Sequence, residues 1–462
     1  MAKELKQVLT IGGGINTGVP PLFIDDSEHT YSRNLDSWKH PSLATRPPRS
    51  TYGAVNSTNA ISLGQRNNQY LHIVDGNTWK YWNPATTAYV NLTTTLSSTE
   101  AEIAEFNTGT AKYSILMNST QKYYWDGTST CLVLGTSDTP LTKIFAIHKG
   151  RVYGARDNDI KYCALNLINN WASTDSGAGT IDVTRAKGAI TGMVEYLDHV
   201  IVFTEHSMHE LWGTGPSNYN LTDVEGGRGC ISHRSITECN GSLYWMWYDG
   251  IYVYNGGTHQ KVSQPVKDYI DNINLTYKTK IVGGAAGDYL YMSIPYGASA
   301  VGLNLLLKYD TKLDKWYPET GNFIDFIVIG NTLYGIDNAG QTWNMRDYSA
   351  TEGKDSASWI PWNWVSKPFN SKPSDDLNIG EIYSVLDMTT NSTTLTLGWD
   401  DQVYNNDSTS FDTLKTFTPS SNVQNVKAIM PNSLTNLNWY RLRYDGSGHI
   451  EIHSVEINGG VG

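Results

Sequence analysis

Three groups of residues have types and spacing that could support chemistry: a glycine run, a histidine pair and several paired aspartates. The glycines at 12–14 could bind a phosphate through backbone N–H groups, but they lack the G-x-G-x-x-G spacing and the following helix of such loops. His206 and His209 could share a metal ion on a helix. The surrounding residues favour a strand, where positions three apart lie on opposite faces. We therefore interpret the glycines as part of a flexible segment and expect no metal at the histidines.

The paired carboxylates are Asp25–Asp26, Asp375–Asp376 and Asp400–Asp401, all in regions that we expect to be loops. Glycoside hydrolysis requires two carboxylates on opposite sides of one cleft, and neighbours on one loop do not supply that geometry. The acidic stretch 398–412 lacks the alternating ligands and the glycine turn of an EF-hand. A calcium ion at 398–412 is left as an open alternative.

The four cysteines, Cys131, Cys163, Cys230 and Cys239, form no CxxC pair and lie in no cluster with zinc-ligand spacing. We expect them to be buried, reduced thiols. The sequence also has no nucleophile elbow and no Ser-His-Asp signature. We therefore predict that the protein is not an enzyme and has no catalytic residues, no cofactor-binding residues and no metal site.

The elements that must position any site come from a repeat. A strand, a tight turn and an aromatic strand recur seven times, as in "QYLHIVDGNTWKYWN" (69–83) and "NGSLYWMWYDGIYVYNGG" (240–257). The first strands of the seven hairpins align at Tyr70, Tyr113, Val152, Val200, Leu243, Leu290 and Leu333. Their spacing of about 39 to 48 residues is typical of propeller blades.

Most of these hairpins have a short apolar strand before them and a polar strand after them, which makes four strands per repeat. Sheets of this kind bury both faces when they stack around an axis, and only short edges stay exposed. We predict an all-β protein with a seven-bladed β-propeller at 45–350. The last blade lacks an obvious fourth strand, so we expect it to borrow one from 43–55. Only one helix is expected, at 264–273.

The remaining segments lack the repeat. The polar segment 351–358 is typical of a linker, and 359–462 contains alternating strands that predict a C-terminal β-sandwich. Residues 1–44 are rich in glycine and polar residues and too poor in apolar ones to fold alone. We expect them to form an extended N-terminal arm that could strap onto a neighbouring subunit.

The composition limits the classes of partner. Only 17% of the 462 residues are charged, and the formal net charge is −11. A protein that grips nucleic acid through its phosphates needs patches of Lys and Arg instead. The first residues have no apolar signal segment, and no run approaches the roughly 18 apolar residues of a membrane span. We expect no secretory signal, no membrane contact and no tight hold on DNA.

Three separate stretches resemble one family of bacteriophage virion proteins. The first, "GGGINTGVPPLFIDDSEHTYSRNLDSW" with the following "LATRPPRS", lies within 12–50. It is similar to a glycine-rich arm that leads to acidic and RPG-like motifs in that family. Asp26 and Glu28 stand in the acidic motif and Arg46 opens the second motif, but Pro48 occupies a place where the family often has Gly.

The other two stretches are 229–270, which resembles the family's repeated "G–RSI–NG–LYF–DGVY–G–ISEPI" block, and 439–457, which resembles its C-terminal "YR–R–SGSG" strand pair. The family is that of the tail nozzle, hub or DNA-stabilisation proteins of short-tailed phages, which are β-propeller proteins. The resemblance implies a non-enzymatic structural protein of the virion tail, made in the host cytoplasm. Such a subunit forms a homo-oligomeric ring, a hexamer, around the DNA exit channel and retains and guides the genome.

The partners that this resemblance implies are the head-to-tail adaptor or portal above the ring, and tail fibres or a tail plug below it. DNA would pass through the channel without sequence-specific contact. Two other classes stay open. A receptor- or carbohydrate-binding tail adhesin would present aromatic side chains in loops, whereas most aromatics here lie in expected strands. A propeller glycosidase would need the paired carboxylates that the sequence does not place across one cleft.

Overall fold

The fold is all-β, as predicted, and the single expected helix is present. The computed structural model describes residues 3–97, 100–128, 130–183, 188–369, 377–388, 394–401, 411–418, 423–430 and 439–461. Within these residues the chain forms 41 strands, a few 3₁₀ turns and one short α-helix, α1 (Lys267–Asp271), directly after the 3₁₀ turn η3 (Gln264–Val266). The prediction of a helix at 264–273 is therefore confirmed.

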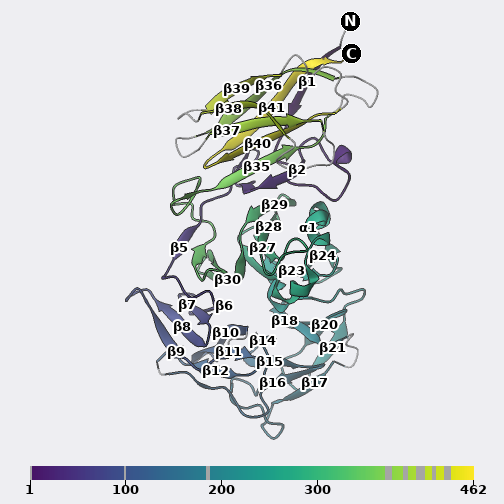
Figure 1. Ribbon diagram of the computed structural model, residues 1–462. Coiled ribbons are helices and arrows are strands. Elements are labelled where there is room, and N and C mark those ends of the chain that lie inside the picture. Colours follow the sequence, from purple (N-terminus) through teal and green to yellow (C-terminus); the bar gives the residue numbers. More distant parts are fainter. Residues whose placement is uncertain are drawn as a thin grey trace.

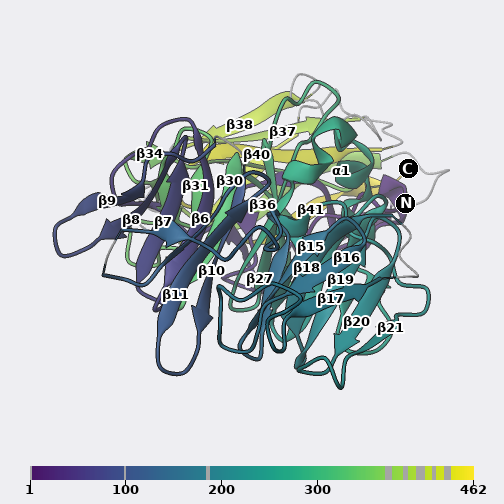
Figure 2. The same ribbon diagram turned by 90° about the horizontal axis from the view of Figure 1, so that it is seen from below.

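Seven antiparallel sheets of four strands each give the lower part of the molecule a propeller-like arrangement (Figure 1, Figure 2). In chain order the first four sheets are β6–β9 (Ala60–Arg66, Tyr70–Asp75, Thr78–Asn83, Ala88–Thr93), β10–β13 (Ala101–Asn107, Lys112–Asn118, Lys122–Trp125, Leu132–Val133), β14–β17 (Phe145–His148, Arg151–Arg156, Asp159–Tyr162, Gly179–Asp182) and β18–β21 (Ile190–Tyr196, His199–Thr204, Met208–Trp212, Asn220–Asp223). The others are β22–β25 (Thr237–Cys239, Ser242–Trp247, Gly250–Tyr254, Gln260–Lys261), β26–β29 (Val282–Ala286, Tyr289–Ile294, Leu305–Asp310, Lys315–Thr320) and β30–β32 (Phe323–Ile329, Thr332–Asp337, Thr342–Asn344) with β5 (Ser50–Tyr52).

The first strands of successive sheets contact one another in a closed circuit. The contacts run from β6 to β10, β14 and β18, then through the 3₁₀ turn η2 (His233–Ser235) and β22 to β26, and through β30 back to β6. All seven hairpin positions aligned in the sequence fall in the second strand of their sheet. The repeat period therefore corresponds to one sheet per repeat, arranged around a common axis.

The alternation within each strand packs every sheet against both of its neighbours. In β23, Leu243 and Trp245 belong to a core shared with the preceding sheet, whereas Tyr244 and Met246 belong to a core shared with the following one. Successive side chains of a strand point to opposite faces, so a sheet that lies between two others needs apolar residues at consecutive positions. This explains why the aromatic residues of 240–257 serve mainly as packing between sheets.

The ring closes with a strand from the N-terminal side, as predicted. β5 pairs antiparallel with β32, so the seventh sheet has four strands like the others. Tyr52 of β5 packs against Tyr334 of the seventh sheet, with ring centroids 4.5 Å apart, and against Trp82 of the first sheet at 6.3 Å. This aromatic seam joins the two ends of the circuit.

Two larger sheets stack above the ring in Figure 1. One has the order β3-β4-β41-β36-β39, with β1 also paired to β41, and the other has the order β2-β35-β40-β37-β38. Their strands are β1 (Lys3–Leu9), β2 (His29–Arg33), β3 (Leu35–Asp36), β4 (Leu43–Thr45), β35 (Pro361–Ser366), β36 (Leu377–Asp387), β37 (Leu395–Asp400), β38 (Asp412–Phe417), β39 (Val423–Ile429), β40 (Arg441–Ser447) and β41 (Glu451–Val461). One core lies between the sheets, with Ile382 and Ile457 from the first and Trp364 and Leu442 from the second.

The N-terminal segment differs from the extended arm predicted for 1–44. Its strands β1 and β4 pair with β41, and β2 pairs with β35, so the segment is woven into sheets of its own chain and does not extend as a free strap. The reason is its few apolar side chains: Leu9, Ile11 and Leu35 are buried in the core between the two larger sheets. These residues are too few to form a core alone but sufficient to join an existing one.

The segment predicted as a linker, 351–358, is also structured. It contains the two-strand ladder β33 (Lys354–Asp355) with β34 (Ser358–Trp359). This hairpin lies between the last sheet of the ring and β35, and its Asp355 takes part in the ionic contacts described next.

Candidate functional site

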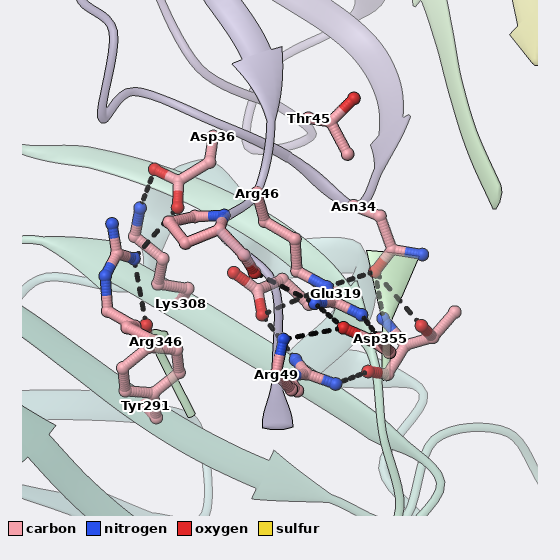
Figure 3. Close-up of polar contacts among 12 residues, drawn as sticks. Asn34, Asp36, Thr45, Arg46, Arg49, Tyr291, Lys308, Glu319, Arg346 and Asp355 are labelled. Atoms are coloured by element: carbon pink, nitrogen blue, oxygen red, sulfur yellow. Dashed lines mark hydrogen bonds and ion pairs between the residues drawn. The ribbon is translucent and has the colours of Figure 1, made fainter. Parts of the chain in front are cut away.

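The junction between the ring and the two larger sheets holds a network of buried charges, shown in Figure 3. Asp36 of β3 ion-pairs with Lys308 of β28 and, at 2.9 Å, with Arg346, which follows β32. The side chains of Asp36 and Lys308 are fully buried, and that of Arg346 is nearly so. Arg346 also donates a hydrogen bond of 3.0 Å to the hydroxyl of Tyr291. One carboxylate of the N-terminal segment thus joins two cations of the ring.

Two further arginines, Arg46 and Arg49, continue this network. Arg46 binds Asp355 through both ends of its guanidinium, with Nη1 donating over 2.8 Å, and the backbone N–H of Arg49 donates to the same carboxylate at 2.8 Å. The side chain of Arg49 ion-pairs with the buried Glu319 at 2.5 Å. Asn34 accepts from the backbone N–H of Thr320 at 2.8 Å. Two-point contacts between arginine and carboxylate fix orientation as well as distance.

Burial and charge oppose each other in this network. Burial alone would raise the pKa of Asp36, but the Lys308 and Arg346 cations lower it to about 2. Burial lowers the pKa of Lys308, and Asp36 partly offsets that effect. A buried ion pair contributes little net stability, but the loss of one partner leaves an uncompensated buried charge. The junction therefore holds the ring and the larger sheets in one fixed geometry.

The axis of the ring is crossed by an arginine. Arg234 lies in η2, ahead of the fifth sheet, and donates to the carbonyl oxygens of Ile61 at 2.8 Å and Ala101 at 2.7 Å. Those residues begin the inner strands of the first and second sheets. Its guanidinium also lies 3.8 Å from Asp325 of the seventh sheet and 3.9 Å from Glu102 of the second. One side chain thus contacts three of the seven sheets.

The two carboxyl groups around Arg234 have unusual pKa values. Burial raises the pKa of Glu102 to about 8, with Asp325 raising it further and Arg234 opposing the shift. Burial also raises the pKa of Asp325, against the effect of Arg234 and of the backbone N–H of Leu63. Together these groups place a protonatable ion cluster among the inner strands of the ring.

A cavity of about 860 Å³ lies at the mouth of the axis. Arg234 and Glu100 line it beside Lys280, and Trp343 and Asn322 come from the loops and strands around its rim. A smaller cavity of about 270 Å³ lies along the inner strands and is also lined by Arg234 and Glu102. Arg234 lines both cavities.

The residues singled out in the sequence are not brought together. In the glycine run, a Cβ on Gly13 would lie 2.5 Å from Ser27, and Gly14 has a φ of +79°, so the glycines serve close backbone packing. His209 is buried between Ser207 and Asp223, at 2.8 and 2.7 Å. His206 is exposed and stacks on Tyr248. The two histidines do not share a site.

The paired aspartates are also separate from one another. Asp26 is exposed and ion-pairs with Lys367 at 2.5 Å, whereas Asp400 is buried and binds Arg441 through both oxygens. Asp375 and Asp376 lie outside the described residues, as does most of the stretch 398–412. The calcium alternative at 398–412 therefore stays open.

All four cysteines are free thiols, and the three in the later sheets are buried as expected. Burial raises the pKa of Cys163 to about 11 and the pKa of Cys230 and Cys239 to about 12. Cys131 is only half-buried. A thiol with a raised pKa is a poor nucleophile at neutral pH, so the three buried cysteines are chemically inert.

The sequence analysis missed the axial cluster, because Glu102, Arg234 and Asp325 are far apart in the chain and meet only when the ring closes. One local signal was available. Arg234 belongs to the "HRSI" run, within one of the stretches that carry the family resemblance. An arginine next to buried strands in such a run is a candidate for a buried ionic contact.

The comparisons with known proteins give no family. No family model matches the chain, and no curated protein matches it. Among solved structures, it is similar to a chain of the mitotic checkpoint complex, at 12% identity and a TM-score of 0.41, over 66% of this chain and 93% of that one. It is also similar to the extracellular domain of a hybrid two-component system from B. thetaiotaomicron, at 9% identity and a TM-score of 0.46, over 75% of this chain and 44% of that one.

Proposed function

We propose that the seven four-stranded sheets are the blades of a seven-bladed β-propeller and that the two larger sheets form a β-sandwich. The closed circuit of inner strands and the strand that β5 lends to the seventh sheet support the propeller. The single core between the larger sheets supports the sandwich. The sandwich would combine residues of 359–462 with strands of the N-terminal segment.

We propose further that the protein is a non-enzymatic structural subunit of a phage tail, a nozzle or hub that forms a ring around the DNA exit channel. The observation that carries this proposal is the buried ionic junction of Asp36, Lys308 and Arg346, together with the arginine on the ring axis. These contacts tie the sheets of the ring and the two larger sheets into one stiff block. Such a block suits side-by-side packing in a larger assembly, and the sequence resemblance supports the same role.

In this proposal the DNA path lies between subunits, since Arg234 and its carboxyl neighbours occupy the axis of each single ring. The net charge of −11 supports a channel wall that does not retain phosphates. The adaptor or portal would dock above the ring, and fibres or a plug below. Among the described residues, no helix has the length and apolar character needed to cross a bilayer.

One observation favours a second candidate, a carbohydrate-binding adhesin. The cavity at the mouth of the ring combines the indole of Trp343 with the amides of Asn322 and Asn338, and sugar sites commonly combine an aromatic ring with a few polar groups. A Trp343→Ala variant tested on a glycan array separates the two roles. Specific glycan binding by the wild type that is lost in the variant would favour the adhesin.

The main test is the state of assembly. The purified full chain is expected to form closed rings of uniform order, sixfold if the resemblance holds, in electron micrographs and in mass measurements by light scattering. Virions that lack the protein are expected to package DNA and then lose it, or to lack the distal tail. Full, complete virions that fail only in host attachment would contradict the nozzle proposal.

A further inference from the structure

We propose that Asp387, His449 and Glu451 form a binding site for a divalent transition-metal ion such as Zn²⁺, at the corner where β36 meets the start of β41. One ligand atom from each of these residues lies within 4.8 Å of the others. Imidazole nitrogen with carboxylate oxygens is a ligand set that zinc accepts. This proposal is independent of the proposed function.

The strand register creates the need for a cation at this place. Asp387 at the end of β36 lies directly opposite Glu451 at the start of β41. Like charges directly opposite on neighbouring strands destabilise a sheet. His449 precedes Glu451 by two residues, and its Nε2 atom lies 3.6 Å from the Oε1 atom of Glu451. Two carboxylates and an imidazole nitrogen therefore meet at one corner of the sheet.

His449 also lies close to a third carboxylate. Its Nδ1 atom is 3.1 Å from the Oε2 atom of Glu352, in the segment that follows the last sheet of the ring, but this contact lacks the geometry of a hydrogen bond. The imidazole is therefore surrounded by negative charge from Glu352 and Glu451.

Lys39 supplies only part of the missing positive charge. Its Nζ atom lies 2.6 Å from Glu451 and 3.6 Å from Glu352. Three carboxylates thus surround one ammonium group and one imidazole whose side chain is only 2% exposed. A divalent ion would compensate the two remaining negative charges. Such an ion would hold the end of β36 to the start of β41 and to the residues that precede it.

A second histidine–carboxylate group could also bind Zn²⁺, so the experiment needs a control for binding there. His148, Glu195 and Asp198 also have ligand atoms within 4.8 Å of one another. Glu195 and Asp198 are exposed there, and Asp198 is already paired with Lys149. We therefore expect weaker binding at that group, and Glu195→Gln removes one of its ligands for the test.

The test is calorimetric titration of Zn²⁺ into the full chain after chelator treatment, with Ca²⁺ as a comparison ion. The wild type is expected to bind one Zn²⁺ per chain more tightly than Ca²⁺ and to melt at higher temperature with Zn²⁺. Asp387→Asn should abolish this binding with little change in shape, and His449→Gln should do the same. Glu352→Gln should weaken it while keeping one site, because it removes one of the three carboxylates around His449 and Lys39. The exposed His206→Ala is the matched control and should bind as the wild type does.

Two results would overturn the proposal. One is the absence of stoichiometric Zn²⁺ binding by the folded wild type. The other is binding that survives Asp387→Asn and is lost with Glu195→Gln, which would assign the ion to the second group. If His449→Gln fails to fold, Asp387→Asn and Glu352→Gln still decide the question, because both replace partly exposed side chains by neutral groups of the same shape.

Discussion

The substitution Asp36→Asn tests whether the buried ionic junction holds the molecule together. The amide has the shape of the carboxylate but no charge, so Lys308 and Arg346 would stay buried without their counter-ion. The interaction with these cations lowers the pKa of Asp36 from 3.8 to about 2. At about 1.36 kcal/mol per pKa unit, this difference corresponds to about 2.4 kcal/mol. Leaving buried charges unpaired raises the expected cost to about 3–5 kcal/mol.

The pH dependence gives the sign of the effect. Asp36 has a lower pKa in the folded protein than in the unfolded chain, so its contribution is complete above about pH 4 and is lost as the pH falls toward 2. The wild type should therefore exceed Asp36→Asn in free energy of unfolding at pH 7. The difference should shrink at about pH 2.5, where the wild-type carboxyl also becomes partly protonated.

The assay is guanidinium unfolding followed by tryptophan fluorescence at the two pH values. Asp26→Asn is the matched control, because Asp26 is 69% exposed in its ion pair with Lys367 and exposed pairs contribute at most about 1 kcal/mol. Adding Lys308→Met to Asp36→Asn should recover part of the loss, since it removes one of the two unpaired cations. A loss below about 1 kcal/mol for Asp36→Asn at pH 7, or a loss equal at both pH values, would refute the reasoning.

Three further predictions concern the ring. Glu102→Gln should stabilise the protein by on the order of 1–2 kcal/mol at pH 9 and have little effect at pH 5, as thermal melting would show. Folding raises the pKa of Glu102 from 4.5 to about 8, so the ionised carboxylate destabilises the folded protein. This penalty is absent below pH 4.5, grows as the pH rises and is complete above pH 8. Tyr52→Ala should lower the free energy of unfolding by about 2 kcal/mol, because it removes the ring contacts to Tyr334 and Trp82 at the seam. An unchanged melting temperature would contradict this prediction. Iodoacetamide should label only Cys131 in the native protein, and mass spectrometry showing two or more labels would contradict the burial of the other three thiols.

The local part of the fold was readable from the sequence because each sheet of the ring is built from neighbours in the chain. The hairpins around Tyr70, Leu243 and Leu333 carry their own turns and their own alternation, so the period of the sequence matches the period of the sheets. The closing strand was also predictable, since the seventh repeat lacked a fourth strand and a ring must close. β5 meets β32 as this reasoning required.

The N-terminal segment and the axial cluster could not be predicted in the same way. The hydroxyl of Thr30 donates to the backbone oxygen of Ser366, a contact between residues more than 330 positions apart, and nothing near either residue indicates the other. Glu102 and Asp325 likewise meet Arg234 only after all the intervening sheets have stacked. The low apolar content of the N-terminal segment indicated that the segment could not fold alone, and we therefore predicted a free arm. Apolar content does not indicate whether a segment can add its few apolar side chains to the core of another domain.

The axial cluster has a consequence for any role at a DNA channel. Arg234 hydrogen-bonds to the first and second sheets and ion-pairs with Asp325 of the seventh, so opening the axis would break contacts to several sheets at once. The removal of one partner from a buried ionic cluster lowers the free energy of unfolding by several kcal/mol. Here the same residues also hold the inner strands of the ring together. In the proposed nozzle, the DNA path therefore lies among several copies arranged around a common centre. The proposed nozzle role therefore requires an oligomer, and a chain that stays monomeric at high concentration would contradict that role.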